Sequence, residues 1–252
     1  MSLRRLENKI IKLLAESSYM PPKNEALIKV SISQFYGIEI NDFAVSVART
    51  ALWIAESQMW NETQRMNEAQ RLIPFLGDLL PLKTYNHIVE DNALRVDWKT
   101  LVLPDSTLYI VGNPPFVGQS VRTKEQSDDM AFIWGKGEIE TKLDYVICWY
   151  KKAMDYIKGT SVKAAFVSTN SICQGESVPT FWKLMIDKGA EIIFAYRSFV
   201  WSSEAIEKAA VHCVIVGFSD GRNDGAKFIF DKKSKIEAMR INPYLYDAPD
   251  NG

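Results

Sequence analysis

Apolar residues in two parts of this chain recur every three or four positions, the spacing of one face of an α-helix. Leu3, Leu6, Ile10 and Leu13 follow this spacing with charged residues between them, and the pattern stops before two prolines at 21–22. It predicts a helix over about 3–14. A longer helix is predicted after Asp42, which can cap it, and we expect its apolar positions to pack on a sheet; they are Val45, Val47, Ala48, Ala51, Leu52, Ile54 and Ala55.

Other parts of the chain carry short, continuous apolar runs that are typical of buried strands. These runs cover 108–112, 164–168, 192–196, 211–218 and 227–230, with a further extended stretch at 30–39 and a strand at about 87–89. Helical spacing returns at 143–157 and 181–188. The alternation of strands and helices predicts an α/β fold. The turn residues at 220–225 predict that the last two strands form an antiparallel hairpin.

Three stretches lack a clear period and are predicted to be connections. Composition turns polar at 61–70, and Pro74 and Pro81 interrupt the segment that follows. Residues 117–129 are rich in polar residues and are expected to form a loop, in which Arg122 and Lys124 either contact phosphates or simply lie in solvent. Residues 242–252 are expected to be a linker. The chain is therefore divided into a core at 1–241 and a tail at 242–252.

Composition narrows the class of protein further. The chain has 252 residues, 47% of them hydrophobic, and a formal net charge of −1. Such a balance is ordinary for a globular protein and gives no global basic field, so any contact with nucleic acid must be local. The longest apolar run, 211–218, is too short to span a bilayer. The first helix carries charges that exclude a signal peptide, so we expect a cytoplasmic protein without membrane contact.

Cysteine and histidine give no sign of a metal site. Cys148, Cys173 and Cys213 are far apart and lack CxxC spacing. They are therefore interpreted as reduced thiols inside or beside apolar elements. His87 and His212 are interpreted as core or surface residues, and no metal is expected.

The most informative stretch is the strand at 108–112, because Asn113-Pro114-Pro115-Phe116 follows it directly. Proline fixes φ, so the Asn113 side-chain oxygen and the Pro114 carbonyl can be held toward one point. Two such acceptors can bind both hydrogens of an exocyclic amine, and Phe116 can stack on the base that carries it. The alternative is a Pro-Pro turn that merely ends a sheet.

This segment resembles motif IV of the amino-methyltransferases, the Asn/Asp-Pro-Pro-Tyr/Phe signature. The resemblance extends to surrounding residues and is most specific to the adenine DNA methyltransferase domain of MmeI-like (type IIG/IIL) restriction-modification proteins, which have the gamma-type motif order. It rests on four segments in the same order, at 35–41, 51–56, 81–89 and 113–118. The resemblance covers almost the whole chain, to about Tyr246.

The resemblance implies transfer of a methyl group from S-adenosylmethionine to adenine N6 of a flipped base in double-stranded DNA. It implies a Rossmann-like class I methyltransferase sheet, here with an antiparallel C-terminal hairpin. The catalytic residues it implies are Asn113, Pro114, Pro115 and Phe116. The cofactor residues are Glu39, Ile40, Asp91, Asn92, Ala93 and Asn113, with the choice between Asp91 and Asn92 open at the adenine end. Phe116 and, more weakly, Phe199 are the candidates for contact with the base.

One family feature has no match here. Motif I, a strand with a Gly-rich loop for the methionine end of the cofactor, would precede the helix at 3–14. The first strand of the sheet is therefore expected to be missing, and the nuclease and target-recognition domains of a longer parent are expected as partners. Two alternatives remain open at this point: an N-methyltransferase of protein glutamine or an RNA base, and an inactive binding module that lacks the cofactor loop.

Overall fold

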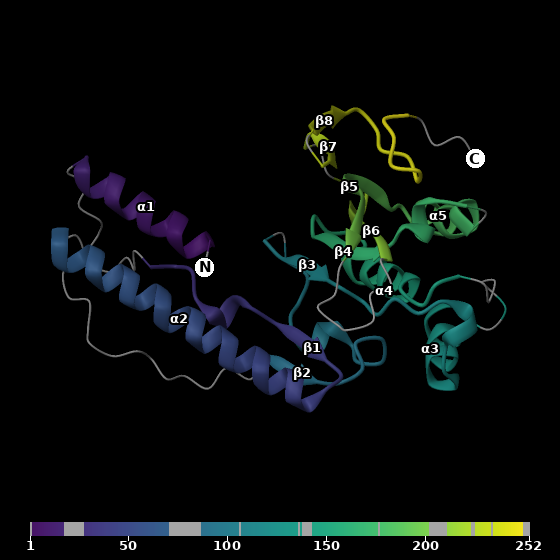
Figure 1. The fold of residues 1–252 in the computed structure, drawn as a ribbon, viewed down its shortest axis with the longest axis horizontal. Helices are drawn as coiled ribbons and strands as arrows, with labels where there is room; N and C mark the ends of the chain where they lie inside the picture. The colour runs from purple at the N-terminus through teal and green to yellow at the C-terminus, as the bar shows by residue number, and fades with distance from the viewer. Residues whose placement is uncertain are drawn as a thin grey trace. The chain divides into compact units, whose positions relative to one another are not determined.

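The computed structural model describes two compact units, residues 1–97 and 98–252 (Figure 1). Residues outside the description are 1, 18–27, 71–86, 106, 136, 138–142, 176, 202–210, 223–224, 233 and 249–252. The connection predicted around Pro74 and Pro81 lies among them. Each unit combines helices with a sheet, so the predicted mixture of helices and strands is confirmed.

The first unit is built on a parallel pair of short strands. Its elements are α1 Ser2–Glu16, η1 Ile32–Gln34, β1 Gly37–Glu39, α2 Asp42–Gln70 and β2 Ile88–Glu90. β1 lies beside β2 in parallel, with Glu39 opposite Glu90. Because the strands are parallel, the residues that follow them lie at the same edge of this small sheet.

Local polar contacts correct three boundaries predicted for this unit. The extended stretch at 30–39 is shortened to β1, because Ser31 and Gln34 form a capping box that starts the 3₁₀ turn η1. The cap of α2 is Asn41, whose Oδ1 accepts from the Ala44 N–H (2.9 Å), and not Asp42. α2 continues through the polar residues to Gln70, since helix formation tolerates a solvated polar stretch.

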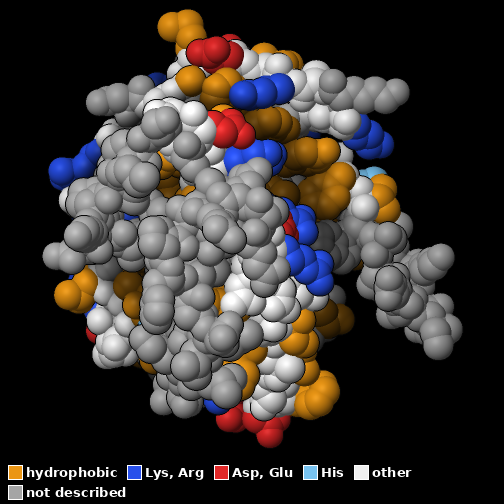
Figure 2. Space-filling view, turned by 90° about the vertical axis from the view of Figure 1, so that its left-hand side faces the viewer, with side chains coloured by type: hydrophobic (Ala, Val, Ile, Leu, Met, Phe, Trp, Pro, Cys, Tyr) orange, Lys and Arg blue, Asp and Glu red, His pale blue; other side chains and the backbone are white. Residues whose placement is uncertain are grey.

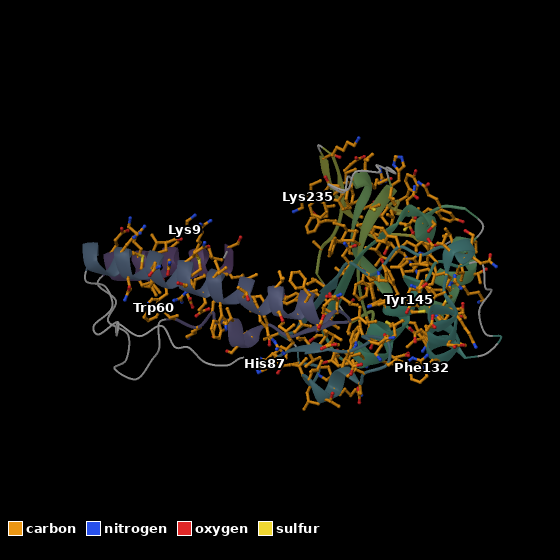
Figure 3. The ribbon with its side chains drawn as sticks, turned by 60° about the horizontal axis from the view of Figure 1, so that its bottom comes forward. Lys9, Trp60, His87, Phe132, Tyr145 and Lys235 are labelled. Atoms are coloured by element: carbon orange, nitrogen blue, oxygen red, sulfur yellow. The ribbon has the colours of Figure 1, made fainter. Side chains whose placement is uncertain are left out.

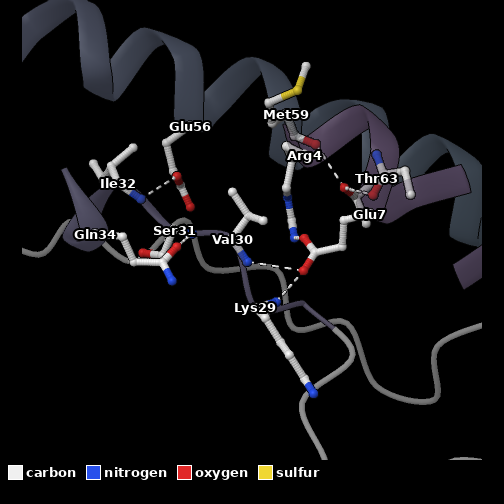
Figure 4. A network of polar contacts seen from close by, with 11 residues as sticks. Arg4, Glu7, Lys29, Val30, Ser31, Ile32, Gln34, Glu56, Met59 and Thr63 are labelled. Carbon is white, nitrogen blue, oxygen red and sulfur yellow. Dashed lines mark hydrogen bonds and ion pairs between the residues drawn. The ribbon is translucent and has the colours of Figure 1, made fainter. Parts of the chain in front are cut away.

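α1 packs through a polar stripe and not through its leucines. Arg4, Asn8 and Ile11 are buried, whereas Leu3, Leu6, Ile10 and Leu13 are exposed. Thr63 of α2 donates to Asn8 Oδ1 (3.1 Å), and Glu7 of α1 pairs with Arg4 and accepts from the Val30 N–H (3.0 Å), as Figure 4 shows in part. Val47 and Ile54 of α2 are exposed as well, so the prediction that the whole apolar face of α2 is buried is wrong. Figure 2 shows hydrophobic side chains at the surface between charged ones.

The second unit contains a six-stranded sheet in the order β3-β4-β6-β5-β7-β8. Its strands are β3 Tyr109–Gly112, β4 Lys163–Thr169, β5 Glu191–Trp201, β6 Val211–Ser219, β7 Lys227–Asp231 and β8 Ser234–Ala238. The other elements are η2 Trp98–Thr100, η3 Gln119–Val121, α3 Lys124–Trp134, α4 Ile147–Ile157, η4 Asn170–Cys173 and α5 Ser177–Asp187. β3, β4, β5 and β7 run in one direction, and β6 and β8 run in the other.

The hairpin predicted between 211–218 and 227–230 is wrong, although both strands exist. β5 lies between them and pairs antiparallel with β6 and parallel with β7. The antiparallel partner of β7 is β8. A strand can pair along both of its edges, and residues 194–196 of β5 face β6 on one edge and β7 on the other.

Aromatic rings fill the core of this unit. Tyr150 of α4 is fully buried, and its ring contacts those of Phe166, Phe181, Trp182 and Phe218. The Tyr150 hydroxyl is paired with Ser168 Oγ (2.9 Å), so these two buried hydroxyls satisfy each other. The buried face of the sheet is thereby anchored to α4 and α5.

Residues 117–129, predicted to be a loop, are partly helical. Thr123 and Gln126 form a capping box that begins α3, and this signal outweighs the polar composition. Arg122 donates to the Leu143 carbonyl. Residues 242–248 also differ from the linker expected there, since Leu245 is buried and Asn242 N–H donates to Tyr246 O (2.9 Å). No helix in the described ranges is long and apolar enough to cross a membrane.

Candidate active site

The Asn113–Phe116 segment leaves the carboxyl end of β3 at the surface. Asn113 and Pro115 are exposed, Pro114 is buried and Phe116 is half-buried. Gly112 precedes them, and a Cβ at this position would lie 3.1 Å from Cδ1 of Phe166 on β4. The absence of a side chain at residue 112 lets the end of β3 lie against β4, while one buried proline fixes the turn and leaves the Asn113 amide in solvent.

Strand register brings further polar residues to the same edge. β3 and β4 are parallel, with Gly112 opposite Phe166, so Thr169 at the end of β4 and η4 after it lie on the side where Asn113 follows β3. Thr169 lies opposite Cys213 of β6, and Cys213 lies opposite Phe199 of β5. Phe199 is half-buried and packs edge-to-face on Tyr196 at 5.5 Å between ring centroids. This edge of an α/β sheet is where ligands bind.

A carboxylate lies among these segments. Asp144 Oδ2 accepts a hydrogen bond from Thr169 Oγ1 (2.6 Å) and another from Ser171 Oγ. The two hydroxyl oxygens are themselves 2.8 Å apart. The other carboxylate oxygen, Oδ1, lies 3.5 Å from the position a Cβ would take on Gly118, two residues after Phe116. Asp144 therefore sits between the end of β4 and the loop that follows β3.

Tyr145 links the same loop to α3. Its N–H donates to the Val117 carbonyl (3.0 Å), and its hydroxyl donates to Asp129 Oδ2 on α3 (2.6 Å). Tyr145 and Asp129 are both buried, and Figure 3 shows Tyr145 among the packed side chains of this unit. Asp144 and Tyr145 thus contact the end of β4, the loop after β3, and α3.

The first unit holds all the residues predicted for the cofactor except Asn113. Glu39 is half-buried at the end of β1, and its Oε1 accepts from the N–H groups of Ile40 (3.0 Å) and Asn41 (3.3 Å). The Asp91 N–H donates to the Glu39 carbonyl (3.0 Å), which places the residues after β2 beside the end of β1. Ile40 is exposed, and Ala93 is half-buried.

Asp91 and Asn92 differ in how the turn uses their side chains. Asp91 is exposed and its Oδ1 accepts from the Asn92 N–H (2.7 Å). Asn92 is half-buried, and its Oδ1 accepts from the Leu94 N–H (2.9 Å). Glu39, Asp91 and Asn92 are thus brought to one edge of the small sheet, and Asp91 presents more of its side chain to solvent.

The cysteines match their predicted state. Cys148, Cys173 and Cys213 are free and buried, and burial raises the pKa of the Cys148 thiol to about 12. Thiolate character is therefore suppressed. Among the described residues, no three His, Cys, Asp or Glu side chains group as metal ligands.

Sequence reasoning singled out Asn113–Phe116 and Phe199 but missed Asp144, Thr169 and Ser171 as one cluster. Asp144 is 25 residues from Thr169 and 27 from Ser171, so no local period could connect them. The available signal covered only part of the cluster: Thr169 and Ser171 lie at the end of β4, the same edge to which β3 brings Asn113, but nothing local points to Asp144.

The chain is similar to known proteins in sequence and in structure. The sequence pattern described as "MmeI, DNA-methyltransferase domain" matches residues 1–231. DNA methyltransferase A of Bacillus subtilis (strain 168) is 42% identical over 253 residues, covering 98% of this chain and 27% of that protein. The structure of the Type IIL restriction-modification enzyme MmeI in complex with DNA matches with a TM-score of 0.84 and 38% identity, over 99% of this chain and 33% of that one. The chain spans about a quarter of the curated relative's length.

Proposed function

The chain belongs to the family of MmeI DNA-methyltransferase domains, and from this membership we propose that it transfers a methyl group from S-adenosylmethionine to N6 of an adenine flipped out of double-stranded DNA. The observation that carries the proposal is the exposed Asn113 amide on a turn fixed by buried Pro114, at the carboxyl edge of β3.

The chemistry rests on two acceptors at one amine. The Asn113 side-chain oxygen and the Pro114 carbonyl accept the two N6 hydrogens, which keeps the nitrogen lone pair on the nitrogen instead of in the ring. Positive charge develops on this amine as the new N–C bond forms, and fixed acceptors act on that charge. Stacking on Phe116 holds the base, and Phe199 at the same sheet edge is the second aromatic candidate for this contact.

The residues of the first unit fit the nucleoside end of the cofactor. Glu39 and Asp91 are joined by a backbone hydrogen bond at the edge of the β1–β2 sheet, and each carries a carboxylate there. A carboxylate at the end of the second strand is the group that accepts from ribose hydroxyls in nucleotide-binding folds. Glu39 would bind the ribose, and Asp91 or Asn92 the adenine, with Ile40 and Ala93 beside it. When bound, S-adenosylmethionine supplies an electrophilic methyl group.

The biological setting follows from the family. DNA is the proposed partner, and nuclease and target-recognition domains of a longer parent protein would supply cleavage and sequence choice. Such an enzyme works where the chromosome lies, so the cytoplasm is its proposed location. The missing first strand of the sheet stays a prediction.

An acceptor panel tests the proposal. The chain is incubated with S-adenosylmethionine carrying a tritiated methyl group and with duplex DNA, RNA or a glutamine-containing protein acceptor. We expect label in DNA alone. Label in RNA or in the protein would replace DNA with one of the alternative acceptors, and no label despite measurable cofactor binding would indicate an inactive binding module.

Replacement of Glu39 by glutamine is expected to weaken S-adenosylmethionine binding roughly ten- to a hundredfold, because a charged hydrogen bond contributes roughly 1.5–3 kcal/mol and 1.4 kcal/mol is a factor of ten. Isothermal titration measures the change. Glu90→Gln is the matched control, because Glu90 ends the neighbouring strand opposite Glu39 and has no proposed contact. Equal affinities for wild type and Glu39→Gln would remove Glu39 from the site.

A further inference from the structure

We propose that Asp144 is a positioning residue that holds the catalytic loop to the end of β4 by way of Tyr145. The catalytic loop is defined as residues 113–118. The inference rests on the proposed function for the role of the loop, but the link between Asp144 and the loop is a structural claim of its own.

First, Asp144 is hydrogen-bonded to the end of β4. Its Oδ2 accepts from Thr169 Oγ1 (2.6 Å) and from Ser171 Oγ. Thr169 is the last residue of β4, and Ser171 is in η4. Two hydroxyl donors on one carboxylate oxygen are charge-assisted hydrogen bonds, which are stronger than neutral ones. The backbone at 144 is thereby fixed to the end of a strand inside the sheet.

Second, Tyr145 is hydrogen-bonded to the catalytic loop. The Tyr145 N–H donates to the Val117 carbonyl (3.0 Å), one residue after Phe116. Gly118 brings its backbone close to Asp144, since a Cβ there would lie 3.5 Å from Oδ1. Fixing residue 144 therefore fixes Tyr145, and Tyr145 fixes the carboxyl end of the catalytic loop.

Third, the side chain of Tyr145 is held by other contacts. Its buried hydroxyl donates to Asp129 on α3 (2.6 Å), and its ring packs edge-to-face on Trp149 of α4 at 5.1 Å. These contacts anchor the side chain of Tyr145 to helices. Asp144 is the contact that joins this turn to β4, so its removal should loosen the loop without unfolding the helices.

The test is amide hydrogen exchange of Tyr145 by NMR on the whole chain labelled with ¹⁵N-tyrosine. Because this N–H is bonded to Val117 O, its exchange reports opening of the link itself. We expect Asp144→Ala to speed exchange at least tenfold, the effect of losing one charge-assisted hydrogen bond. Asp144→Asn keeps an acceptor oxygen and should give a smaller increase, and it serves as the readout should the alanine variant fail to fold.

Two further variants separate this role from general destabilisation. Thr169→Val with Ser171→Ala removes the donors, and adding it to Asp144→Ala should have no further effect, because both changes remove the same contact. Asp155→Asn is the matched control: Asp155 is an exposed acid on α4 that pairs with Lys151 and Lys188, and its loss should leave Tyr145 exchange within about twofold. Unchanged Tyr145 exchange in a folded Asp144→Ala or Asp144→Asn protein would overturn the proposal.

Methyl transfer gives the functional readout. For Asp144→Ala we expect kcat to fall about tenfold, with KM for S-adenosylmethionine changed less than twofold, because a displaced loop lowers the rate while every proposed cofactor residue except Asn113 lies outside the loop, at the ends of β1 and β2. An equal rise in KM would contradict a positioning role. Absence of transfer by the wild-type chain would count against the proposed function alone, since the exchange experiment decides the link independently.

Discussion

Asn113→Ala is expected to lower the rate of methyl transfer about a hundredfold. The substitution removes one of the two acceptors aimed at the amine where charge develops, and one such group is typically worth ~3 kcal/mol, which corresponds to roughly two powers of ten in rate. Asn113 is exposed, so the fold should tolerate the change. The measurement is the initial rate of tritiated methyl transfer to DNA at saturating S-adenosylmethionine.

Two variants control this experiment. Asn113→Asp keeps acceptor oxygens at the same place, as the Asn/Asp form of the signature allows, and should retain more activity than alanine. Asn61→Ala removes an exposed amide from α2 and should leave the rate unchanged. Full turnover by Asn113→Ala would exclude this side chain from the mechanism.

Gly217→Ala is expected to destabilise the protein by about 3 kcal/mol, the upper end of what overpacking costs. A Cβ on Gly217 would lie 2.1 Å from Cε1 and 2.3 Å from Cδ1 of the Phe194 ring. The ring lies across β6 and contacts Phe230 edge-to-face at 6.5 Å, so it must give up packing to make room. Urea denaturation followed by circular dichroism measures the loss.

Phe194→Ala provides the matched background for this prediction. With the ring removed, the three atoms nearest to the added methyl group are gone, so Gly217→Ala should cost less than about 1 kcal/mol there. A double-mutant cycle isolates this coupling. Equal costs in both backgrounds would show that the Phe194 ring is not what requires glycine at 217.

The positions of several strands could be predicted from local sequence. β3, β4 and β6 stand where continuous apolar runs predict them, but the burial expected of β3 is wrong: none of its residues is buried, and Tyr109 and Val111 are exposed, whereas β4 and β6 carry buried residues. Their pairing could not be predicted in the same way. β5 separates β6 from β7, and which strand lies beside which depends on contacts between residues far apart in the sequence, not on the turn at 220–225.

The local structure of polar segments was harder to predict than the positions of the strands. α3 was expected to be loop because residues 117–129 lack an apolar period, yet Thr123 and Gln126 form a capping box. The same motif at Ser31 and Gln34 starts η1 within a stretch expected to be extended. In both places two side-chain hydrogen bonds to the backbone decide the local structure, which a reading based on hydrophobic period overlooks.

The candidate site was predictable where its residues adjoin a strand and not where they meet in space. Asn113 is exposed at the end of β3, the place that the apolar run at 108–112 predicts. Asp144 meets Thr169 and Ser171 across 25 and 27 residues of sequence, at the end of β4. Hydrophobic pattern fixes neither that approach nor the choice of hydroxyl partners.

Mass spectrometry of nucleosides tests the central claim most directly. DNA is incubated with the chain and S-adenosylmethionine carrying a deuterated methyl group, and is then digested to nucleosides. We predict the label in N6-methyladenine, formed by wild type and reduced about a hundredfold by Asn113→Ala. Label in a cytosine nucleoside, or equal N6 labelling by the two proteins, would contradict the assignment of Asn113 and Pro114 as the acceptors for the adenine amine.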